Sequence, residues 1–377
     1  MDFDPSWLLW GLPIAFVLGW IASRLDLRQL RIENRQAPKA YFRGLNFLLN
    51  EQQDQAIDAF IEAVQNDPDT TELHFALGNL FRRRGEYERA VRVHEHLLSR
   101  GDLSRAERHR AQHALALDFL KAGLLDRAEE ALRKLEGTAF EGQALLALLA
   151  IYERSRDWPQ ASEIARKLEA SGHGNFSGRQ AHYLCEQAAN AAPEQAERLL
   201  REAMKADPGA ARPGIDLAAL QRRAGNADAA FDTLASLGKS APAAVPLVAR
   251  HLTEAAIASG RQAQALALLR AGYEQSPSLD VLEGIVALEP DATEARSWYV
   301  KHLEREPSLV AATKWLAGER LEHEQFHPFV QGALDHAVKP LTRYRCAACG
   351  FEAKQHFWQC PGCQAWDSYP ARRVEEL

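Results

Sequence analysis

Residues 344–370 read YRCAACGFEAKQHFWQCPGCQAWDSYP and hold four of the five cysteines of this 377-residue chain. The cysteines form two Cys-x-x-Cys pairs, Cys346 with Cys349 and Cys360 with Cys363, separated by ten residues. Each pair can bend into a tight knuckle that places both sulfurs on one ion. Two knuckles give the tetrahedral four-sulfur site that zinc or a single iron prefers. The spacing therefore predicts a small module that binds one iron or zinc ion through these four cysteines.

The residues around the cysteines agree with this prediction, although two other chemistries remain open at this point. Gly350 and Gly362 suit knuckle backbones, which we expect to need positive φ and close approach of N–H groups to sulfur. The alternatives are two disulfides or a redox-active Cys-x-x-Cys. A redox motif normally stands alone in a strand–helix context, and disulfides require an oxidising compartment.

The compartment is indicated at the other end of the chain. Residues 5–23 (PSWLLWGLPIAFVLGWIAS) carry no charge. As a helix they would span about 28 Å, enough for a hydrocarbon core. Asp2 and Asp4 precede this stretch, whereas a basic cluster follows it, namely Arg24, Arg28, Arg31, Arg35 and Lys39. The asymmetry predicts a single-pass anchor with a cytoplasmic body, whose cysteines stay reduced. A cleaved signal peptide, the alternative, would carry its basic residues before the apolar run.

Between these ends the sequence has the period of tetratricopeptide repeats, which is about 34 residues. A small–aromatic–alanine pattern occurs in Gly44, Phe47 and Ala56 and recurs one period later in Gly78, Phe81 and Ala90. The small residues allow two helices to approach closely, and the aromatic residue fills the gap to the next repeat. The pattern continues with drift to a degenerate eighth unit, marked by Ala128, Ala161, Ala196, Ala230, Ala265 and Ala295. We expect an all-α superhelix over residues 38–340, with a concave groove.

Some residues of the repeats invite a functional interpretation. Arg82 and Arg83 would give the groove a positive spot for an acidic partner if they point inward. Cys185 is expected to be a buried structural thiol. Four histidines lie close together in the sequence, and we expect them to be solvated or groove-lining rather than a second metal site: His94, His96, His109 and His113.

Composition and motifs exclude two broad classes of function. The net charge of −6, with 25% charged residues, argues against a nucleic-acid binder, which would present a basic face. The sequence contains no nucleotide loop, nucleophile elbow or paired-carboxylate motif, so we do not expect an enzyme. These features favour a protein that binds other proteins.

The order of these parts resembles the lipopolysaccharide assembly protein B (LapB) family over the whole chain. The run from Tyr344 to Ser368 is similar to that family's rubredoxin-like signature. The resemblance implies a non-catalytic inner-membrane adaptor that brings the lipid A deacetylase LpxC to the membrane protease FtsH and is opposed by a LapC-type regulator. A general envelope-assembly scaffold and a rubredoxin-type electron-transfer protein are the alternatives. A homodimer is compatible with the sequence.

These observations divide the chain into an anchor (1–24), a juxtamembrane linker (25–37), repeats with closing helices (38–340) and a rubredoxin-like or zinc-ribbon module (341–377). The module has few apolar residues and too little core to fold alone. We therefore expect the metal to supply much of its folding free energy. Some of its aromatic residues should dock on the last helices: Phe351, Phe357, Trp358 and Trp366.

Overall fold

The computed structural model of the chain describes residues 15–20, 39–320 and 322–377. The chain forms two compact units, Met1–Ser155 and Arg156–Leu377. Most of the stretch predicted to span a membrane lies outside the described residues, as does the whole predicted linker (25–37); residues 15–20 are helical. Across the described ranges, no helix has both the length and the apolar character needed to cross a membrane.

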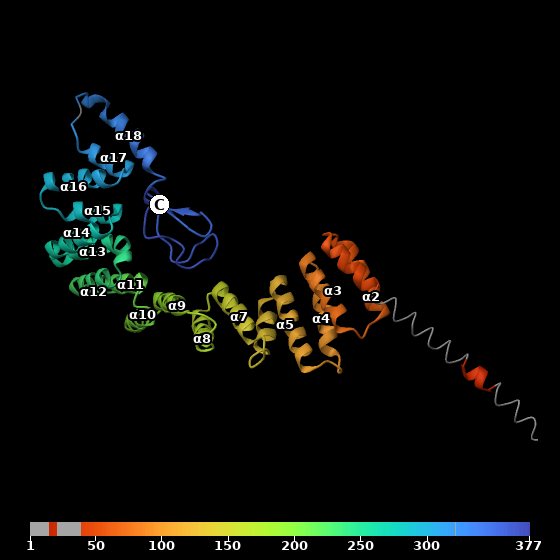
Figure 1. Cartoon of the computed structure of the whole chain (residues 1–377). Helices are drawn as coiled ribbons and strands as arrows, with labels where there is room; N and C mark the ends of the chain where they lie inside the picture. The colour runs from red at the N-terminus through yellow and green to blue at the C-terminus, as the bar shows by residue number, and fades with distance from the viewer. Residues whose placement is uncertain (1–14, 21–38, 321) are drawn as a thin grey trace, which may run out of the picture. The chain divides into compact units, whose positions relative to one another are not determined.

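The first unit is a series of antiparallel helices in which each helix packs on the next (Figure 1). Residues 39–49 are helical and are followed by α2 (Gln53–Asn66), α3 (Thr71–Arg84), α4 (Tyr87–Ser99), α5 (Arg105–Ala122), α6 (Leu125–Arg133) and α7 (Glu141–Ser155).

The second unit continues the helical pattern and ends in the cysteine module. Its helices are α8 (Trp158–Ala170), α9 (Ser177–Ala189), α10 (Pro193–Ala206), α11 (Ala211–Arg223), α12 (Ala227–Ser240), α13 (Val245–Ser259), α14 (Gln262–Gln275), α15 (Leu279–Leu288), α16 (Ala292–Arg305), α17 (Leu309–Ala317) and α18 (His327–Val338). Short 3-10 turns are η1 (Pro242–Ala244), η2 (Glu324–Phe326) and η3 (Val374–Glu376).

The small residues of the repeat pattern lie where helices touch. The alanines at 56, 90, 128, 161, 230 and 265 are all completely buried. A Cβ atom at Gly44 would lie 2.7 Å from the ring of Phe60, and one at Gly78 would lie 2.5 Å from the ring of His94. Only glycine permits so close an approach, which confirms the role predicted for the small positions of the repeats.

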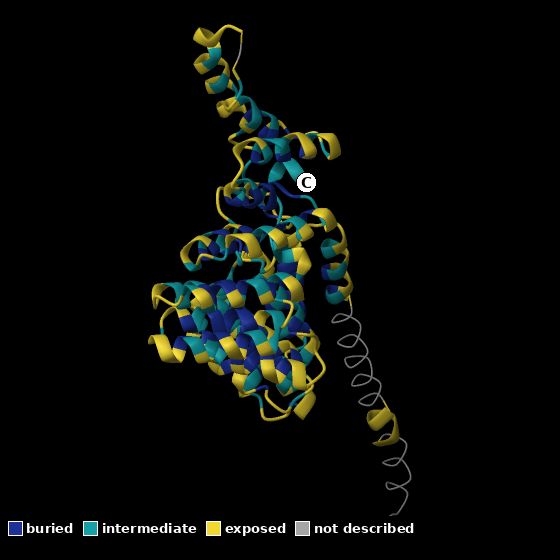
Figure 2. Cartoon of the chain, turned by 90° about the vertical axis from the view of Figure 1, so that its left-hand side faces the viewer, coloured by how far each residue is buried: buried dark blue, intermediate teal, exposed yellow. Residues whose placement is uncertain are grey.

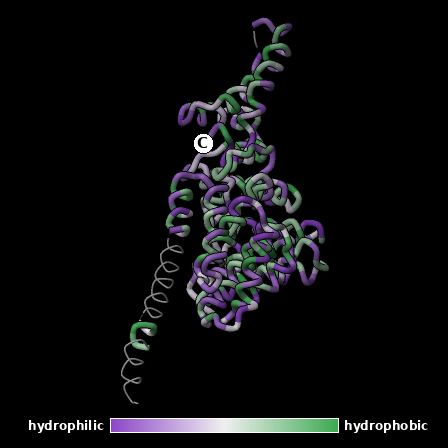
Figure 3. The backbone as a smooth tube through the Cα atoms, turned by 90° about the vertical axis from the view of Figure 1, so that its right-hand side faces the viewer, coloured by the Kyte–Doolittle hydropathy of each residue, from purple (hydrophilic) through white to green (hydrophobic). Residues whose placement is uncertain are grey.

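Local sequence signals set the helix ends. Ser104 and Glu107 form a reciprocal capping box at the start of α5. Gly85 and Gly123 adopt left-handed backbone conformations that end α3 and α5. Hydrophobic and hydrophilic residues alternate along the helices (Figure 3), and the buried residues face the inside of each helical stack (Figure 2).

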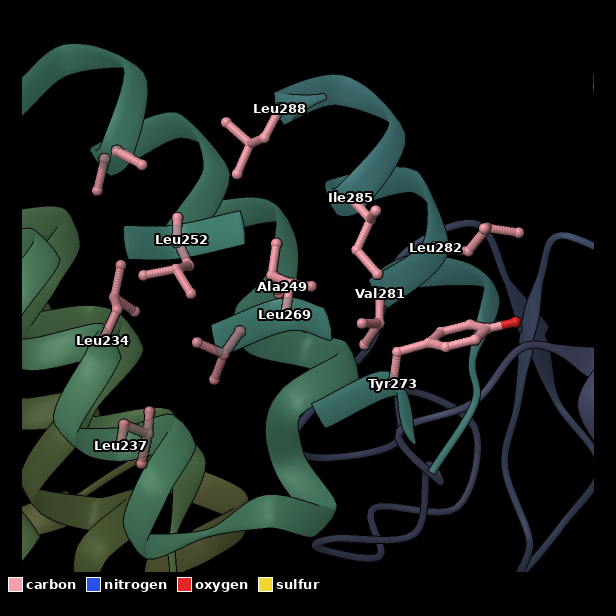
Figure 4. Packing of buried hydrophobic residues seen from close by; sticks show 14 of the residues in the cluster. Leu234, Leu237, Ala249, Leu252, Leu269, Tyr273, Val281, Leu282, Ile285 and Leu288 are labelled. Atoms are coloured by element: carbon pink, nitrogen blue, oxygen red, sulfur yellow. The ribbon is translucent and has the colours of Figure 1, made fainter. Parts of the chain in front are cut away.

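The longest apolar core runs through α11 to α17 of the second unit. Leu234 of α12, Leu252 of α13, Leu269 of α14 and Ile285 of α15 all contribute buried side chains to it (Figure 4). The core continues through successive helix pairs without a break, as expected where each repeat buries its apolar face on its neighbours.

The cysteine module adds the only strands among the described residues. β1 (Tyr344–Arg345) pairs with β2 (Glu352–Ala353) in antiparallel register, and a single bridge joins Gln359 to Trp366. Its own core is small and consists of Tyr344, Cys346, Cys360 and Tyr369. The cysteines therefore lie in loops that are joined by two short strands and one isolated bridge.

Candidate metal centre

The two Cys-x-x-Cys pairs form similar turns. In the first, the N–H of Gly350 donates to the carbonyl of Cys346 at 2.9 Å; in the second, the N–H of Gln364 donates to the carbonyl of Cys360 at 2.8 Å. Gly350 and Gln364 both have positive φ, +78° and +62°. The expectation of positive φ is thus confirmed for Gly350 but wrong for Gly362, because the turn reverses one residue after the second cysteine of each pair.

The four sulfurs converge on one point. All four Sγ atoms lie within 4.8 Å of one another, with 3.8 Å between Cys346 and Cys363 and 3.7 Å between Cys349 and Cys360. A tetrahedron with Zn–S bonds of about 2.3 Å has S···S edges of about 3.8 Å. All five cysteines of the chain are free thiols. The donor set therefore fits one tetrahedrally bound metal ion rather than two disulfides.

The surroundings of two of the four sulfurs, those of Cys346 and Cys360, favour the thiolate form that binds metal. At Cys349 the backbone N–H of Phe351 acts to lower the pKa, but burial and the three neighbouring thiols outweigh it and raise the pKa to about 12. A hydrogen bond with Ser368, whose Oγ lies 3.3 Å from the sulfur, lowers the pKa of Cys346 to about 6, with help from the backbone N–H groups of Cys349 and Ala348. Burial acts to raise the pKa of Cys360, but the N–H groups of Cys363 and Gly362 outweigh it and lower the pKa.

Cys185 lies in a different environment. It is 1% exposed within α9, and burial raises its pKa well above the usual value for a thiol. A protonated, inaccessible thiol neither binds metal nor attacks a substrate readily. The structure thus confirms the prediction of a buried structural cysteine.

Two tryptophans of the module, Trp358 and Trp366, contact His182 of α9 in the middle of the helical unit; the rings of Trp358 and His182 lie 6.0 Å apart. The indole of Trp366 stacks on the ring of His182 at 4.8 Å and meets Trp158 and Tyr183 edge-on at 6.1 and 6.0 Å. Nε2 of His182 lies 2.8 Å from a carboxylate oxygen of Asp367. The expected docking site on the last helices is therefore wrong for Trp366, which packs on α8 and α9.

The last helices are instead contacted by the charged tail of the module. The guanidinium of Arg373 donates to both carboxylate oxygens of Asp280 on α15, at 2.6 and 2.9 Å, and lies 4.2 Å above the ring of Tyr344. The hydroxyl of Tyr344 donates to the same carboxylate at 3.2 Å. The carboxylate of Asp280 thus joins the first strand of the module, its tail and α15.

Two consecutive glutamates complete this attachment. Glu375 accepts hydrogen bonds from the N–H groups of Leu309 and Val310, at the start of α17. Glu376 accepts from the N–H of Leu279, at the start of α15. A carboxylate at a helix N-terminus satisfies free N–H groups and complements the helix dipole. In the sequence these glutamates read only as the charged end of a chain, so sequence reasoning missed them.

In the first unit, Arg82 lies beside a buried acid. Its guanidinium donates to Asp118 at 2.9 Å, to Asn79 at 2.5 Å and to the carbonyl of Ala114 at 3.2 Å, whereas Arg83 is exposed. The charge of Arg82 is therefore largely compensated by Asp118. A role of these two arginines in a partner groove stays a prediction.

The four histidines of this unit occupy different environments. His94 is completely buried, and its Nδ1 lies 2.5 Å from a carboxylate oxygen of Asp118, which corrects the expectation of a solvated or groove-lining side chain. It fills the space that Gly78 leaves between α3 and α4. His113 stacks on Phe140 at 4.9 Å, His109 is half-buried and His96 is exposed.

Comparison with known proteins places these parts in one family. Residues 344–369 match the rubredoxin metal binding domain of the LapB zinc-ribbon type. Lipopolysaccharide assembly protein B of Escherichia coli K12 is 30% identical over 381 aligned positions, which cover 97% of this chain and 98% of that protein. This chain belongs to the lipopolysaccharide assembly protein B family.

More distant relatives extend the comparison. The protein of the same name from Haemophilus influenzae is 28% identical and aligns over 95% of this chain and 96% of its own length. Among solved structures, a tetratricopeptide repeat protein from Parabacteroides merdae matches with a TM-score of 0.35 and 14% identity, covering 67% of this chain and 99% of that chain.

Proposed function

We propose that this protein is a non-catalytic adaptor that regulates lipopolysaccharide synthesis by presenting the deacetylase LpxC to the protease FtsH for degradation. The observation that carries the proposal is the family relation over nearly the whole length of the chain. The helical units support it, because stacked repeats offer extended surfaces for protein partners. A LapC-type inner-membrane regulator would oppose this activity.

The proposal includes the arrangement predicted from the sequence. Residues 1–24 would anchor the chain in the inner membrane, residues 25–37 would link the anchor to the repeats (38–340), and residues 341–377 would form the metal module on the cytoplasmic side. An anchor raises the concentration of the adaptor near a membrane protease. Alkaline phosphatase fused to the C-terminus should be inactive, and an active fusion would overturn this orientation.

In the module, Cys346, Cys349, Cys360 and Cys363 would hold one zinc or iron ion. The ion would cross-link the two knuckles and supply most of the folding free energy of a module whose own core is small. Side chains of the module would hold it against the helices. Trp366 and Asp367 fix one side of the module on α9, and the tail fixes the other side on α15 and α17.

The test is a degradation chase of LpxC in cells depleted of this protein and complemented by variants. Depletion should lengthen the half-life of the deacetylase and raise lipopolysaccharide levels. Deletion of residues 1–23 should fail to restore turnover because co-localisation with the protease is lost. The double variant Cys346→Ser/Cys349→Ser should fail because the module unfolds, whereas Cys185→Ser at equal expression should restore turnover.

An unchanged half-life of LpxC in depleted cells without complementation would defeat the adaptor proposal. It would favour the general scaffold, which a pull-down from native membranes would then identify by its envelope-assembly partners. Pull-down with the double variant shows separately whether the module contributes to partner binding.

A further inference from the structure

The second unit contains an apolar cavity that the metal centre does not use. It lies between α12, α13 and α14 and has a volume of about 250 Å³. Figure 4 shows Leu234, Ala249, Leu252 and Leu269 from these three helices around the space between them. The lining is a buried floor, half-buried walls and an exposed rim, so the cavity is a cleft that opens to solvent at one end.

The packing of this region does not explain the cleft. Gly238 and Gly272 both line the cleft, in the last turns of α12 and α14, where no positive φ calls for glycine. A Cβ atom on Gly272 would lie 3.1 Å from a methyl group of Val245, so a larger residue there would crowd the cleft.

The rim carries one charge. Lys239 is exposed in the last turn of α12, and it is the one charged residue among the residues that line the cleft. Within the part of the chain that the structure describes, its ammonium group has no ion-pair partner. The neutral amide of Gln275 also lines the cleft, and this residue is exposed as well. An occupant would thus meet a long apolar wall and, at the mouth, a cation and an amide.

We propose that the cleft between α12 and α14 binds a single-chain anionic amphiphile of the fatty-acid kind. The acyl chain would lie along Leu234, Leu252 and Leu269, and its carboxylate would pair with Lys239 at the rim. Ligand sites are typically apolar clefts with a few polar groups that fix orientation, and small apolar cavities take up apolar ligands. This site is independent of the proposed adaptor function.

The test is photolabelling of the full chain in nanodiscs of neutral phosphatidylcholine, with a laurate analogue that carries a diazirine near the end of its chain. Mass spectrometry should map the label to peptides of α12, α13 and α14. Unlabelled laurate should compete. Dodecanol should compete about tenfold more weakly, and dodecyltrimethylammonium more weakly still, because neither offers an anion to Lys239.

Two pairs of variants test separately the part of the cleft that would hold the acyl chain and the lysine that would pair with the carboxylate. Ala235→Phe should abolish labelling by filling the cleft, whereas Ala267→Phe, on the exposed side of α14, should leave it unchanged. Lys239→Glu should reduce labelling about tenfold. Lys205→Glu is the matched control, since Lys205 is likewise exposed in the last turn of a helix, α10.

Each outcome decides the proposal. Label spread over the chain, or equal labelling of Ala235→Phe and the native protein when both melt at the same temperature, would overturn the site. Equal competition by laurate and dodecanol, or an unchanged Lys239→Glu, would overturn the anionic assignment. If Ala235→Phe does not fold, the Lys239 and Lys205 pair decides, because both lysines lie at the surface. The proposal would also be overturned if only a peptide, and not laurate, protected the cleft from labelling.

Discussion

The cysteine module and the helices on which it docks belong to one compact unit but differ in how they are stabilised. The helices share an apolar core that extends from Ala211 to Ala311. Each fully buried leucine or isoleucine of that core contributes about 1.5–3 kcal/mol. The module has four core residues, of which two are candidate metal ligands. With a metal ion bound to its four cysteines, the stability of the module would be concentrated in that ion, whereas the stability of the helices is distributed over many side chains.

The attachment of the module shows the same contrast. Neighbouring helices meet through alanine, leucine and isoleucine, but the tail of the module meets α15 and α17 through charged hydrogen bonds. Such bonds are directional and lose strength quickly when geometry changes. The position of the module would therefore depend on a correctly folded metal site. One compact unit thus combines apolar packing between helices with charged hydrogen bonds at the module.

The largest expected effect is the loss of the metal ion from the cysteine module. The double variant Cys346→Ser/Cys349→Ser should lose the ion, reducing metal content from about one per chain to near zero. Structural zinc sites of this kind supply apparent free energies of about 10–16 kcal/mol, so the module should unfold while the helices stay folded. Elemental analysis measures the metal, and hydrogen exchange of residues 344–377 measures the unfolding.

The matched control for this pair is Cys185→Ser, which removes the buried thiol of α9 and leaves the four-sulfur site intact. It should retain the ion. Equal metal content in the double variant and the native chain would contradict the assignment of the site.

A core substitution tests the helical side. Ile285 is completely buried in α15 and does not line the α12–α14 cleft. Ile285→Ala should destabilise the helices by about 2–5 kcal/mol, the usual cost of such a cavity. Metal content should not change, because the sulfur geometry does not depend on this side chain. Urea unfolding followed by helical circular dichroism gives the first quantity; a loss of metal in parallel would show that the two regions are not independent.

The parts predicted well from the sequence are those set by local spacing. The two Cys-x-x-Cys pairs predict their own convergence, because the short chain between the cysteines fixes each knuckle. The repeat period predicts the helix pairs, since alanines such as Ala56 and Ala90 mark equivalent helix contacts in successive repeats. In both cases the information lies in regular spacings along the chain: ten residues between the two cysteine pairs, and 34 residues between Ala56 and Ala90.

The contacts that join the module to the helices could not be predicted in this way. Asp367, the neighbour of Trp366, meets His182 across 185 positions of sequence, and Glu376 meets Leu279 across 97. Nothing in the local sequences distinguishes Trp366 from an exposed aromatic residue or the glutamate from a solvated charged tail. The burial of His94 could not be predicted for a related reason: its acid partner, Asp118, lies on the next helix.

A smaller effect is expected at the polar attachment. Arg373→Gln removes the bidentate bond to Asp280 and leaves a largely buried carboxylate without its cation. Hydrogen bonds to charged groups contribute about 1.5–3 kcal/mol, so module docking should weaken by about 2 kcal/mol while the ion stays bound. Faster hydrogen exchange at the start of α15, with unchanged metal content, is the expected result.

The control for this variant is Arg345→Gln, which removes an exposed pair with Glu352 inside the module. Exposed ion pairs contribute about 0–1 kcal/mol, so exchange at α15 should stay as in the native chain. Equal effects of the two arginine variants would mean that the contact with Asp280 does not hold the module in place.

The smallest expected effect is on the pH dependence of the free energy of unfolding of the helices. His302 is 1% exposed, its Nδ1 lies 2.7 Å from the hydroxyl of Tyr273, and burial lowers its pKa below the usual 6.5. As pH falls through 6.5, the unfolded chain therefore takes up a proton that the folded chain resists, and the free energy of unfolding falls. One such group changes this free energy by at most about 1.4 kcal/mol per pH unit. Burial also lowers the pKa of other histidines, namely His74, His113, His251 and His356.

His302→Gln should remove one share of this pH dependence. The variant loses some stability at neutral pH, but its free energy of unfolding should fall less steeply than that of the native chain between about pH 7.5 and pH 5.5. Urea unfolding at several pH values measures both slopes. His336→Gln is the control, because it replaces an exposed histidine of the same unit. Parallel curves for His302→Gln and the native chain would mean that His302 is protonated equally in the folded and unfolded states. Burial in the helical core would then not determine its charge.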